Sequence, residues 1–222
     1  MTVLIATFKR ESRLAWRQKM DVINPLVFMA LVVTLAPLAL EPSPSLLAKV
    51  AAGLAWIAML LSAQLTGVAM FADDWRSGWL KQIFLTPTPA LFLVSARLAA
   101  WWLIGFLPLV LLGPLAALML GLASAQAGVL GVALLLASPT LLILTALGSA
   151  LTLGIGRAAA LAPLLVLPML VPLLIFGAGI VRLHADGFPV AGQYWLLAAF
   201  SMLAITLGPI AITASLKLHL SD

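Results

Sequence analysis

Residues 71–87, FADDWRSGWLKQIFLTP, gather acidic, basic and aromatic side chains in a chain that is otherwise strongly apolar. The segment holds two adjacent acids, Asp73 and Asp74, and two tryptophans, Trp75 and Trp79. These residue types suit noncovalent recognition, because aromatic side chains dominate the contacts of a helix that docks in a groove. The segment is therefore the first candidate for function.

We expect residues 74–84 to form one amphipathic helix. Trp75, Trp79 and Ile83 are spaced i, i+4, i+8 and would form an apolar stripe, with Leu80 and Phe84 beside it. This geometry favours a docking helix whose anchors are Trp75, Trp79, Leu80 and Ile83.

The residues around the stripe set the expected ends of this helix. Asp73 and Asp74 fall at its predicted start, where the helix dipole favours negative charge. Gly78 would weaken the helix and let it bend or approach a neighbour, and Pro87 and Pro89 would end it. Three interpretations stay open: a helix floating in the headgroups, a reentrant cover on the bundle, or a docking helix for a soluble partner.

Several kinds of chemistry are absent from the sequence. There is no Cys, so there is no thiolate metal site or thiol nucleophile. No Gly-rich phosphate loop followed by Lys and Ser or Thr occurs, so the chain itself does not bind ATP in that way. No ionisable residue is expected in the middle of an apolar span, which argues against an ion-coupled carrier and an intramembrane hydrolase.

A few residues inside the apolar spans have polar or helix-breaking character. Gln64 is interpreted as an interhelical hydrogen-bonding residue, with a substrate contact as the alternative. Pro163, Pro168 and Pro172 interrupt another span. They indicate either a kinked helix repaired by its neighbours or a hinge that changes its bend between states.

The composition predicts a membrane protein. Of 222 residues, 64% are hydrophobic and only 9% are charged, so a soluble domain would expose one continuous apolar surface. The net charge of +5 does not indicate nucleic-acid binding, because the cations lie at the edges of apolar spans.

Residues 1–21 predict an amphipathic helix in the headgroup plane. Its basic face carries Lys9, Arg13 and Arg17 at i, i+4, i+8. Its apolar face would contain Leu4, Ile5, Phe8, Ala15, Trp16 and Met20. Asn24-Pro25 is expected to turn the chain into the membrane. No cleavable signal peptide is predicted, because the first apolar run has the length of a span.

Six membrane-spanning helices follow, and the whole chain, 1–222, is expected to be a single all-α transmembrane permease domain. A β-barrel is excluded because its strands would need alternating polar residues. The third span is expected to be tilted or broken at Pro108 or Pro114. The predicted spans are 25–40, 47–70, 91–121, 128–153, 159–181 and 193–216.

The distribution of Lys and Arg predicts the orientation. Ten of the 12 cations fall on the side that receives both termini, residues 71–97 and the turn at 154–158, which contains Arg157. This side is therefore expected to be cytoplasmic. The connections at 122–127 and 182–192 would face outward.

Short stretches along the whole chain together carry a family resemblance. They are Asn24-Pro25-Leu26, residues 34–38 and 46–50 with Gly53 and Trp56, Asp73-Asp74 with Gly78, Leu80 and Gln82, Gly113-Pro114-Leu115, Pro139-Thr140-Leu141, and LVLPMLVPLLIFG at 165–177. In order and spacing they resemble the haem exporter protein B (CcmB) family, the membrane subunits of the ATP-binding-cassette system for cytochrome c maturation. Ser77 and Lys81 depart from the acidic residues of the family's run, so no specific salt bridge is carried over.

The resemblance implies an ABC-2-like permease of the bacterial inner membrane, with six spans and both termini cytoplasmic. It implies a non-catalytic chain, with ATP bound by a separate CcmA-like ATPase subunit. It also implies CcmC- and CcmD-like haem-handling subunits, indirect contact with a CcmE-like haem chaperone, and a homodimer. No metal or cofactor is expected on this chain, and haem is its implied substrate. The implied ATPase-coupling residues are Asp73, Asp74, Trp75, Gly78, Trp79, Leu80 and Ile83.

The route of haem stays open at this stage. His184, in an outward connection, is a candidate haem contact, because haem iron takes His ligands. The chain would either conduct haem or use ATP-driven motion to release a haem-loaded chaperone. Two alternatives from other classes are a permease for an unrelated lipid or drug and a structural assembly subunit without a transport cycle.

Overall fold

A computed structural model describes residues 2–17, 19–40, 43–85, 87–153 and 161–221, and all the secondary structure in these ranges is helical. The helices are α1 Thr2–Arg17, α2 Lys19–Ala39, α3 Pro44–Arg76, α4 Trp79–Phe84, α5 Ala90–Trp101, the π-helix η1 Trp102–Phe106, α6 Leu107–Met119, α7 Ser124–Leu151, α8 Ala162–Ala185 and α9 Ala191–Ser221.

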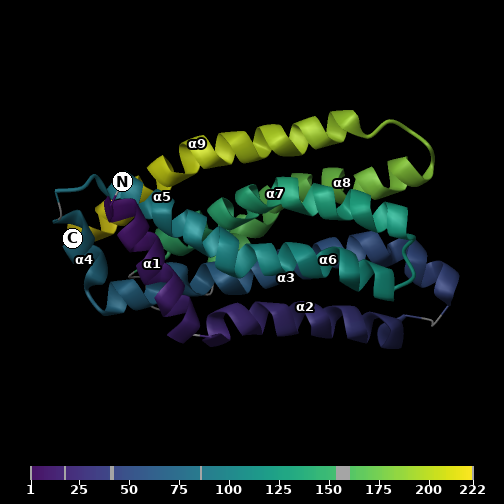
Figure 1. The fold of residues 1–222 in the computed structure, drawn as a ribbon, viewed down its shortest axis with the longest axis horizontal. Helices are drawn as coiled ribbons and strands as arrows, with labels where there is room; N and C mark the ends of the chain where they lie inside the picture. Colours follow the sequence, from purple (N-terminus) through teal and green to yellow (C-terminus); the bar gives the residue numbers. More distant parts are fainter. Residues whose placement is uncertain (1, 18, 41–42, 86, 154–160, 222) are drawn as a thin grey trace.

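The described ranges contain six helical segments long and apolar enough to cross a bilayer, as predicted. They are α2, α3, the continuous α5–η1–α6 run, α7, α8 and α9. Figure 1 shows them side by side along the long axis of the molecule. The start of α1, the end of α9 and α4 lie together at one end of this bundle, and the α6–α7 and α8–α9 connections lie at the other. We call the first of these the α4 end.

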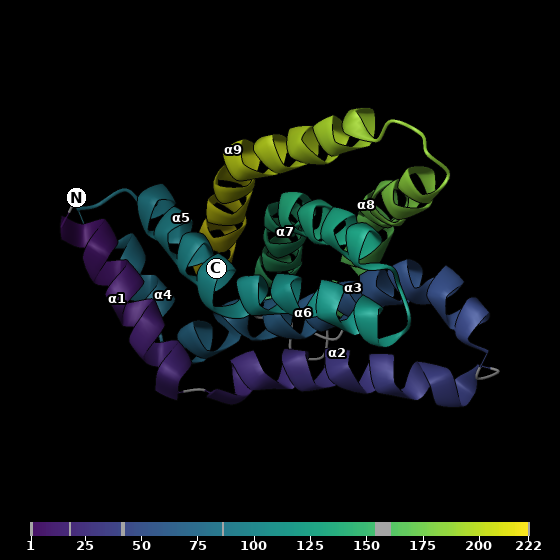
Figure 2. The same cartoon turned by 45° about the vertical axis from the view of Figure 1, so that its right-hand side comes forward.

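The start of the chain differs from the prediction. α1 ends at Arg17 and α2 begins at Lys19, so Asn24-Pro25 lies inside α2 and does not turn the chain. Pro25 is buried, and a proline inside a membrane helix is tolerated where neighbouring helices pack against it. Met20 therefore belongs to α2 rather than to the apolar face of α1. α1 is steeply inclined to α2 in both views (Figures 1 and 2) and packs mainly on α5.

The third span is not broken at Pro108 or Pro114, but its helix is irregular just before Pro108. A π-helical turn, Trp102–Phe106, precedes Pro108, which lies in the first turn of α6. Proline has no N–H to donate, and a local widening of the helix accommodates this loss. Pro114 lies inside α6 without ending it.

Helix α7 is the centre of the bundle, packing against α3, α6, α8 and α9 (Figure 2). Polar side chains fasten α9 to it: the Tyr194 hydroxyl donates to the Val129 carbonyl at 3.1 Å, and the Thr140 and Ser201 hydroxyls lie 3.0 Å apart. Such interhelical hydrogen bonds need no water, which suits an apolar surrounding.

Small residues bring other helices close together. Trp56 of α3 is fully buried against Gly177 of α8, where an added Cβ would lie 2.0 Å from the indole ring. A glycine is therefore required at this contact, because even one methyl group would overlap the ring.

The Gly177 contact gives a stability prediction. Gly177→Ala should lower the free energy of unfolding by about 1–3 kcal/mol through overpacking. The matched control is Gly179→Ala in the same helix, where an added Cβ meets nothing within 4 Å. Thermal unfolding of the two purified variants in detergent measures the difference, and equal midpoints would contradict the packing argument.

Candidate functional site

The polar segment at 71–87 does not form the single helix predicted for 74–84. Helix α3 continues to Arg76, and Gly78, with φ of 72°, redirects the chain into the separate short helix α4. Backbone bonds from Ser77 N–H to Asp73 O at 2.9 Å and from Gly78 N–H to Trp75 O at 3.1 Å close the end of α3. Glycine ends helices in this way because it adopts the left-handed conformation without strain.

The change in helix boundaries reverses the electrostatic role of the two acids. Asp73 and Asp74 lie in the last turn of α3, where the helix dipole disfavours negative charge, so the prediction that they cap a helix start is wrong. Each acid has a cationic partner instead. Asp73 is exposed and pairs with Arg76 at 3.5 Å, whereas Asp74 is buried.

Asp74 belongs to a group of four charged side chains, which we call the charge cluster: Arg10 and Glu11 of α1, Asp74 of α3 and Arg97 of α5. Arg10 is partly exposed, and the other three are buried. Glu11, Asp74 and Arg97 are only 3%, 7% and 8% exposed. The cluster contains two cations and two anions. Its members compensate one another, which is the condition under which charges are tolerated away from water.

The two arginines bridge the two carboxylates. Arg10 pairs with Glu11 at 2.6 Å and with Asp74 at 3.2 Å. Arg97 donates to Asp74 and to the Met70 carbonyl, and its Nε lies 3.8 Å from Glu11. Asp74 therefore receives one arginine from α1 and one from α5.

Aromatic rings extend the cluster to α4. The Arg10 guanidinium lies over the Trp79 ring, 4.1 Å from its centroid, and Arg97 lies 5.1 Å from the centroid of Phe71. Stacking of a guanidinium on an aromatic face is attractive, more so where water is excluded. Helices α1, α3, α4 and α5 thus meet at one set of contacts.

The other predicted coupling residues surround this cluster. Leu80 is buried in the chain's own core, Trp79 is half-buried, and Trp75 contacts His219 of α9 edge to face, with ring centroids 6.1 Å apart. Ile83 lies in α4, but its side chain lies outside the described part of the structure. The outer surface of the turn is formed by Arg76, Ser77, Lys81, Gln82 and Leu85, which are all exposed.

The remaining candidates lie elsewhere. His184 is exposed near the end of α8, at the end of the bundle opposite α4 (Figure 1), and no group of three or more His, Cys, Asp or Glu that could hold a metal occurs in the described ranges. Pro163 lies in the first turn of α8 rather than interrupting it, whereas Pro168 and Pro172 are internal. The turn at 154–158, with Arg157, lies outside the described residues.

Gln64 was predicted to make an interhelical hydrogen bond, and its side-chain nitrogen does not make one. Its side chain is buried in α3, but its Nε2 makes no hydrogen bond to any described residue. The predicted interhelical hydrogen bond is therefore not made through this nitrogen.

Similarity to known proteins identifies the family of this chain. The sequence model of the CcmB protein family matches residues 2–219. This chain belongs to the CcmB family. It is 43% identical over 213 residues to a protein of Pseudomonas aeruginosa named "Heme exporter protein B", with 96% of each chain covered. Proteins of that name from Haemophilus influenzae and Rhodobacter capsulatus are 40% and 37% identical, with 99% and 97% of this chain and 100% and 99% of theirs covered.

Two members of the charge cluster in this CcmB-family chain were missed by sequence reasoning. Arg97 was counted only as a cation at a span edge, yet it lies inside α5 with no charged neighbour in sequence. Glu11 was passed over because only the basic face of α1 was considered, although a lone acid between two arginines on an amphipathic helix was a usable signal.

Removing one charge from the cluster tests its cohesion. Asp74→Asn leaves two arginines facing a single carboxylate, and we expect a loss of about 3–5 kcal/mol in unfolding free energy. The control is Asp73→Asn, which removes an exposed surface pair and should cost about 1 kcal/mol or less. Unfolding of both variants in detergent checks this, and equal losses would mean that the cluster contributes no special stability.

Proposed function

We propose that this chain is the non-catalytic membrane permease subunit of an ATP-driven haem-export complex that serves the biogenesis of c-type cytochromes. The observation that carries the proposal is the near-complete match to relatives named "Heme exporter protein B", which spans essentially all of this chain and of theirs. Six apolar spans provide the membrane body that such a subunit needs.

The ATPase is proposed to be a separate, CcmA-like chain, because this sequence has no Gly-rich phosphate loop. The α3–α4 turn is the proposed contact for it. The turn exposes a polar surface around Lys81 and Gln82, together with Leu85, which is 84% exposed. We retain Asp73, Asp74, Trp75, Gly78, Trp79, Leu80 and Ile83 as the proposed coupling residues, with Leu80 holding α4 to the bundle.

The charge cluster suggests how motion would reach the spans. A partner that displaces α4 would act on α3 through the turn, and on α1 and α5 through Arg10 and Arg97. The spans that contain α3 and α5 would therefore respond together. Nucleotide can drive such a change only by its different affinity for the two arrangements.

The proposed orientation places the α4 end in the cytoplasm of a bacterium, with the spans in the inner membrane. The Lys and Arg distribution supports this orientation, and the inclined α1, with exposed Lys9 and Arg13, suits a helix lying among headgroups. The assembly is proposed to contain two copies of the chain, CcmC- and CcmD-like subunits, and a CcmE-like chaperone as an indirect partner.

We favour a mechanical role over a haem conduit. An apolar groove of about 430 Å³ between α3 and α8 is lined by Leu, Ile, Val and Pro side chains, none of which ligates iron. Pro168 borders this groove. Pro163, Pro168 and Pro172 remain the proposed hinge positions. The work of the ATPase would then release a haem-loaded chaperone from neighbouring subunits.

A deletion strain tests this function. Loss of the gene should abolish covalent haem in c-type cytochromes, measured by haem staining of separated proteins, and the wild-type chain should restore it. Trp79→Glu should fail to restore it and should reduce co-purification of the ATPase subunit, because it removes the ring under Arg10 and adds a third carboxylate to the cluster.

The matched control is Trp195→Glu, the same change at an exposed position near the start of α9, and it should restore haem attachment. Normal cytochrome c in the deletion strain would contradict the proposal and favour a permease for another substrate. Haem attachment that continues with an ATPase-dead partner would contradict the coupling and favour a structural subunit.

A further inference from the structure

The third membrane span is divided into two parts that pack on different neighbours. Its first part, α5, packs mainly on α1 and α9, whereas its second part, α6, packs mainly on α7 and α3. Figure 2 shows α5 beside α1 and α6 in front of α3. The π-helix η1, Trp102–Phe106, lies where the packing partners change.

Backbone hydrogen bonding is irregular at this junction. The Leu107 N–H bonds to the Trp102 carbonyl, five residues earlier instead of four, so the turn holds one residue more than a regular α-helix. Pro108 follows and has no N–H, so the Ile104 carbonyl loses the donor that an α-helix would give it. Helices bend sharply at prolines and at π-turns, so η1 is a point at which this span can bend.

The turn itself is fixed to the bundle. The Trp102 Nε1 donates to the Ser138 hydroxyl of α7 at 2.9 Å, and Phe106 is fully buried. Gly105 lies against α3, where an added Cβ would be 3.3 Å from the Thr66 side chain. These contacts hold η1 between α7 and α3, so a bend at η1 would move α5 about a fixed pivot.

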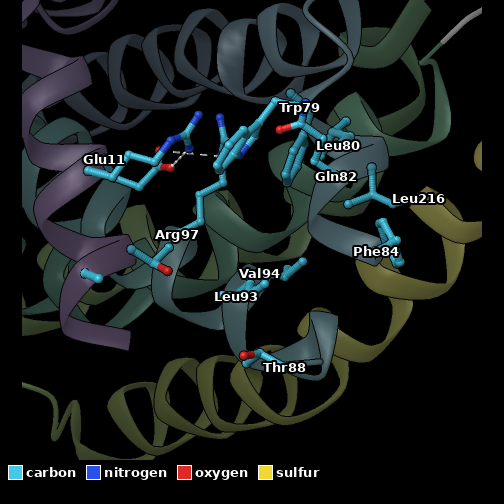
Figure 3. A pocket seen from close by; sticks show the side chains of 14 residues that line it. Glu11, Trp79, Leu80, Gln82, Phe84, Thr88, Leu93, Val94, Arg97 and Leu216 are labelled. Atoms are coloured by element: carbon cyan, nitrogen blue, oxygen red, sulfur yellow. Dashed lines mark hydrogen bonds and ion pairs between the residues drawn. The ribbon is translucent and has the colours of Figure 1, made fainter. Parts of the chain in front are cut away.

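An apolar cavity gives α5 room to move. The cavity has a volume of about 350 Å³ and lies at the α4 end, between α1, α4, α5 and the end of α9. Leu93 and Val94 of α5 line it. Figure 3 shows Arg97 of α5 on one side of it and Phe84 and Leu216 on the other. Protein interiors are normally close-packed, so a cavity of this size is space into which a neighbouring helix can shift.

We propose that η1 is a hinge, about which α5 bends toward and away from α9 while α6 stays packed on α7 and α3. The charge cluster joins Arg97 of α5 to α1 and to the end of α3, so α1 moves with α5. The hinge rests on the proposed ATP-driven cycle, because the partner that acts on α4 supplies the force. It lies in the third span, separate from the proline positions of α8.

Deleting one residue from the turn tests the hinge. Removal of Leu103, which is exposed, takes out the extra residue and makes the turn α-helical without changing the register of α5 and α6. We expect this protein to fold with an unfolding midpoint in detergent no lower than that of the wild-type chain. In the deletion strain it should fail to restore covalent haem in c-type cytochromes.

Two controls separate the turn from the deletion itself. Leu103→Ala keeps the turn and should restore haem attachment. Deletion of Leu111, an exposed residue inside α6, rotates the rest of that helix by about 100° and should lower the unfolding midpoint. Only a deletion within a turn that holds an extra residue leaves the packing on both sides unchanged.

Spin labels measure the motion directly. Phe92→Cys near the start of α5 and Leu151→Cys at the end of α7 are exposed positions in a chain without Cys. Leu103 lies about 16 Å from Phe92 along the helix, so a bend of about 20° moves Phe92 by roughly 6 Å. In the complex with the ATPase, we expect double electron–electron resonance to show a shift of this size on addition of ATP, and no shift in the protein that lacks Leu103.

Four results would overturn the hinge. They are haem attachment restored by the protein without Leu103, a midpoint for that protein as low as that of the Leu111 deletion, an ATP-dependent shift that persists in it, and no shift in the wild-type complex. The proposed function fails by a different result, which is normal cytochrome c in the uncomplemented deletion strain. The unfolding midpoints do not depend on that result, so the two failures are distinguishable.

Discussion

The architecture of the α4 end depends on the pairing of two arginines with two buried carboxylates. Asp74 lies in the last turn of α3, where the helix dipole disfavours an anion, so it requires cations. Arg10 and Arg97 supply them from two other helices, and Glu11 balances the extra positive charge. Removing any one member leaves a buried charge without its counterpart, so the four side chains hold three helices as one unit.

The charge cluster explains why α1, which lies outside the apolar spans, is held to the rest of the bundle. α1 has few contacts apart from those with α5, yet it contributes two members of the cluster. Through Arg10 and Trp79 the same contacts reach α4, and Gly78 gives α4 its direction. A partner protein that displaced the α3–α4 turn would therefore act on α1, α3 and α5 together, as the proposed coupling role requires.

The sequence was sufficient to predict the six spans, because only long apolar helices explain so few charged residues. It also located the polar segment, but periodicity alone placed Trp75, Trp79 and Ile83 on one helix. The left-handed conformation at Gly78 instead separates Trp75, in α3, from Trp79 and Ile83, in α4. Arg97 and Glu11 were missed because their partners lie far away in sequence, and pairing across helices is set by tertiary packing that a local pattern does not contain.

The cohesion of the α4 end can be measured directly, because the chain has no Cys and accepts spin labels at chosen positions. Labels at Arg13→Cys on α1 and Lys81→Cys on α4, both exposed, report the distance between the two helices by double electron–electron resonance. With the cluster intact we expect one narrow distance distribution, and adding Arg97→Gln should broaden it. An unchanged narrow distribution in the Arg97→Gln protein would contradict the view that the charge cluster holds these helices together.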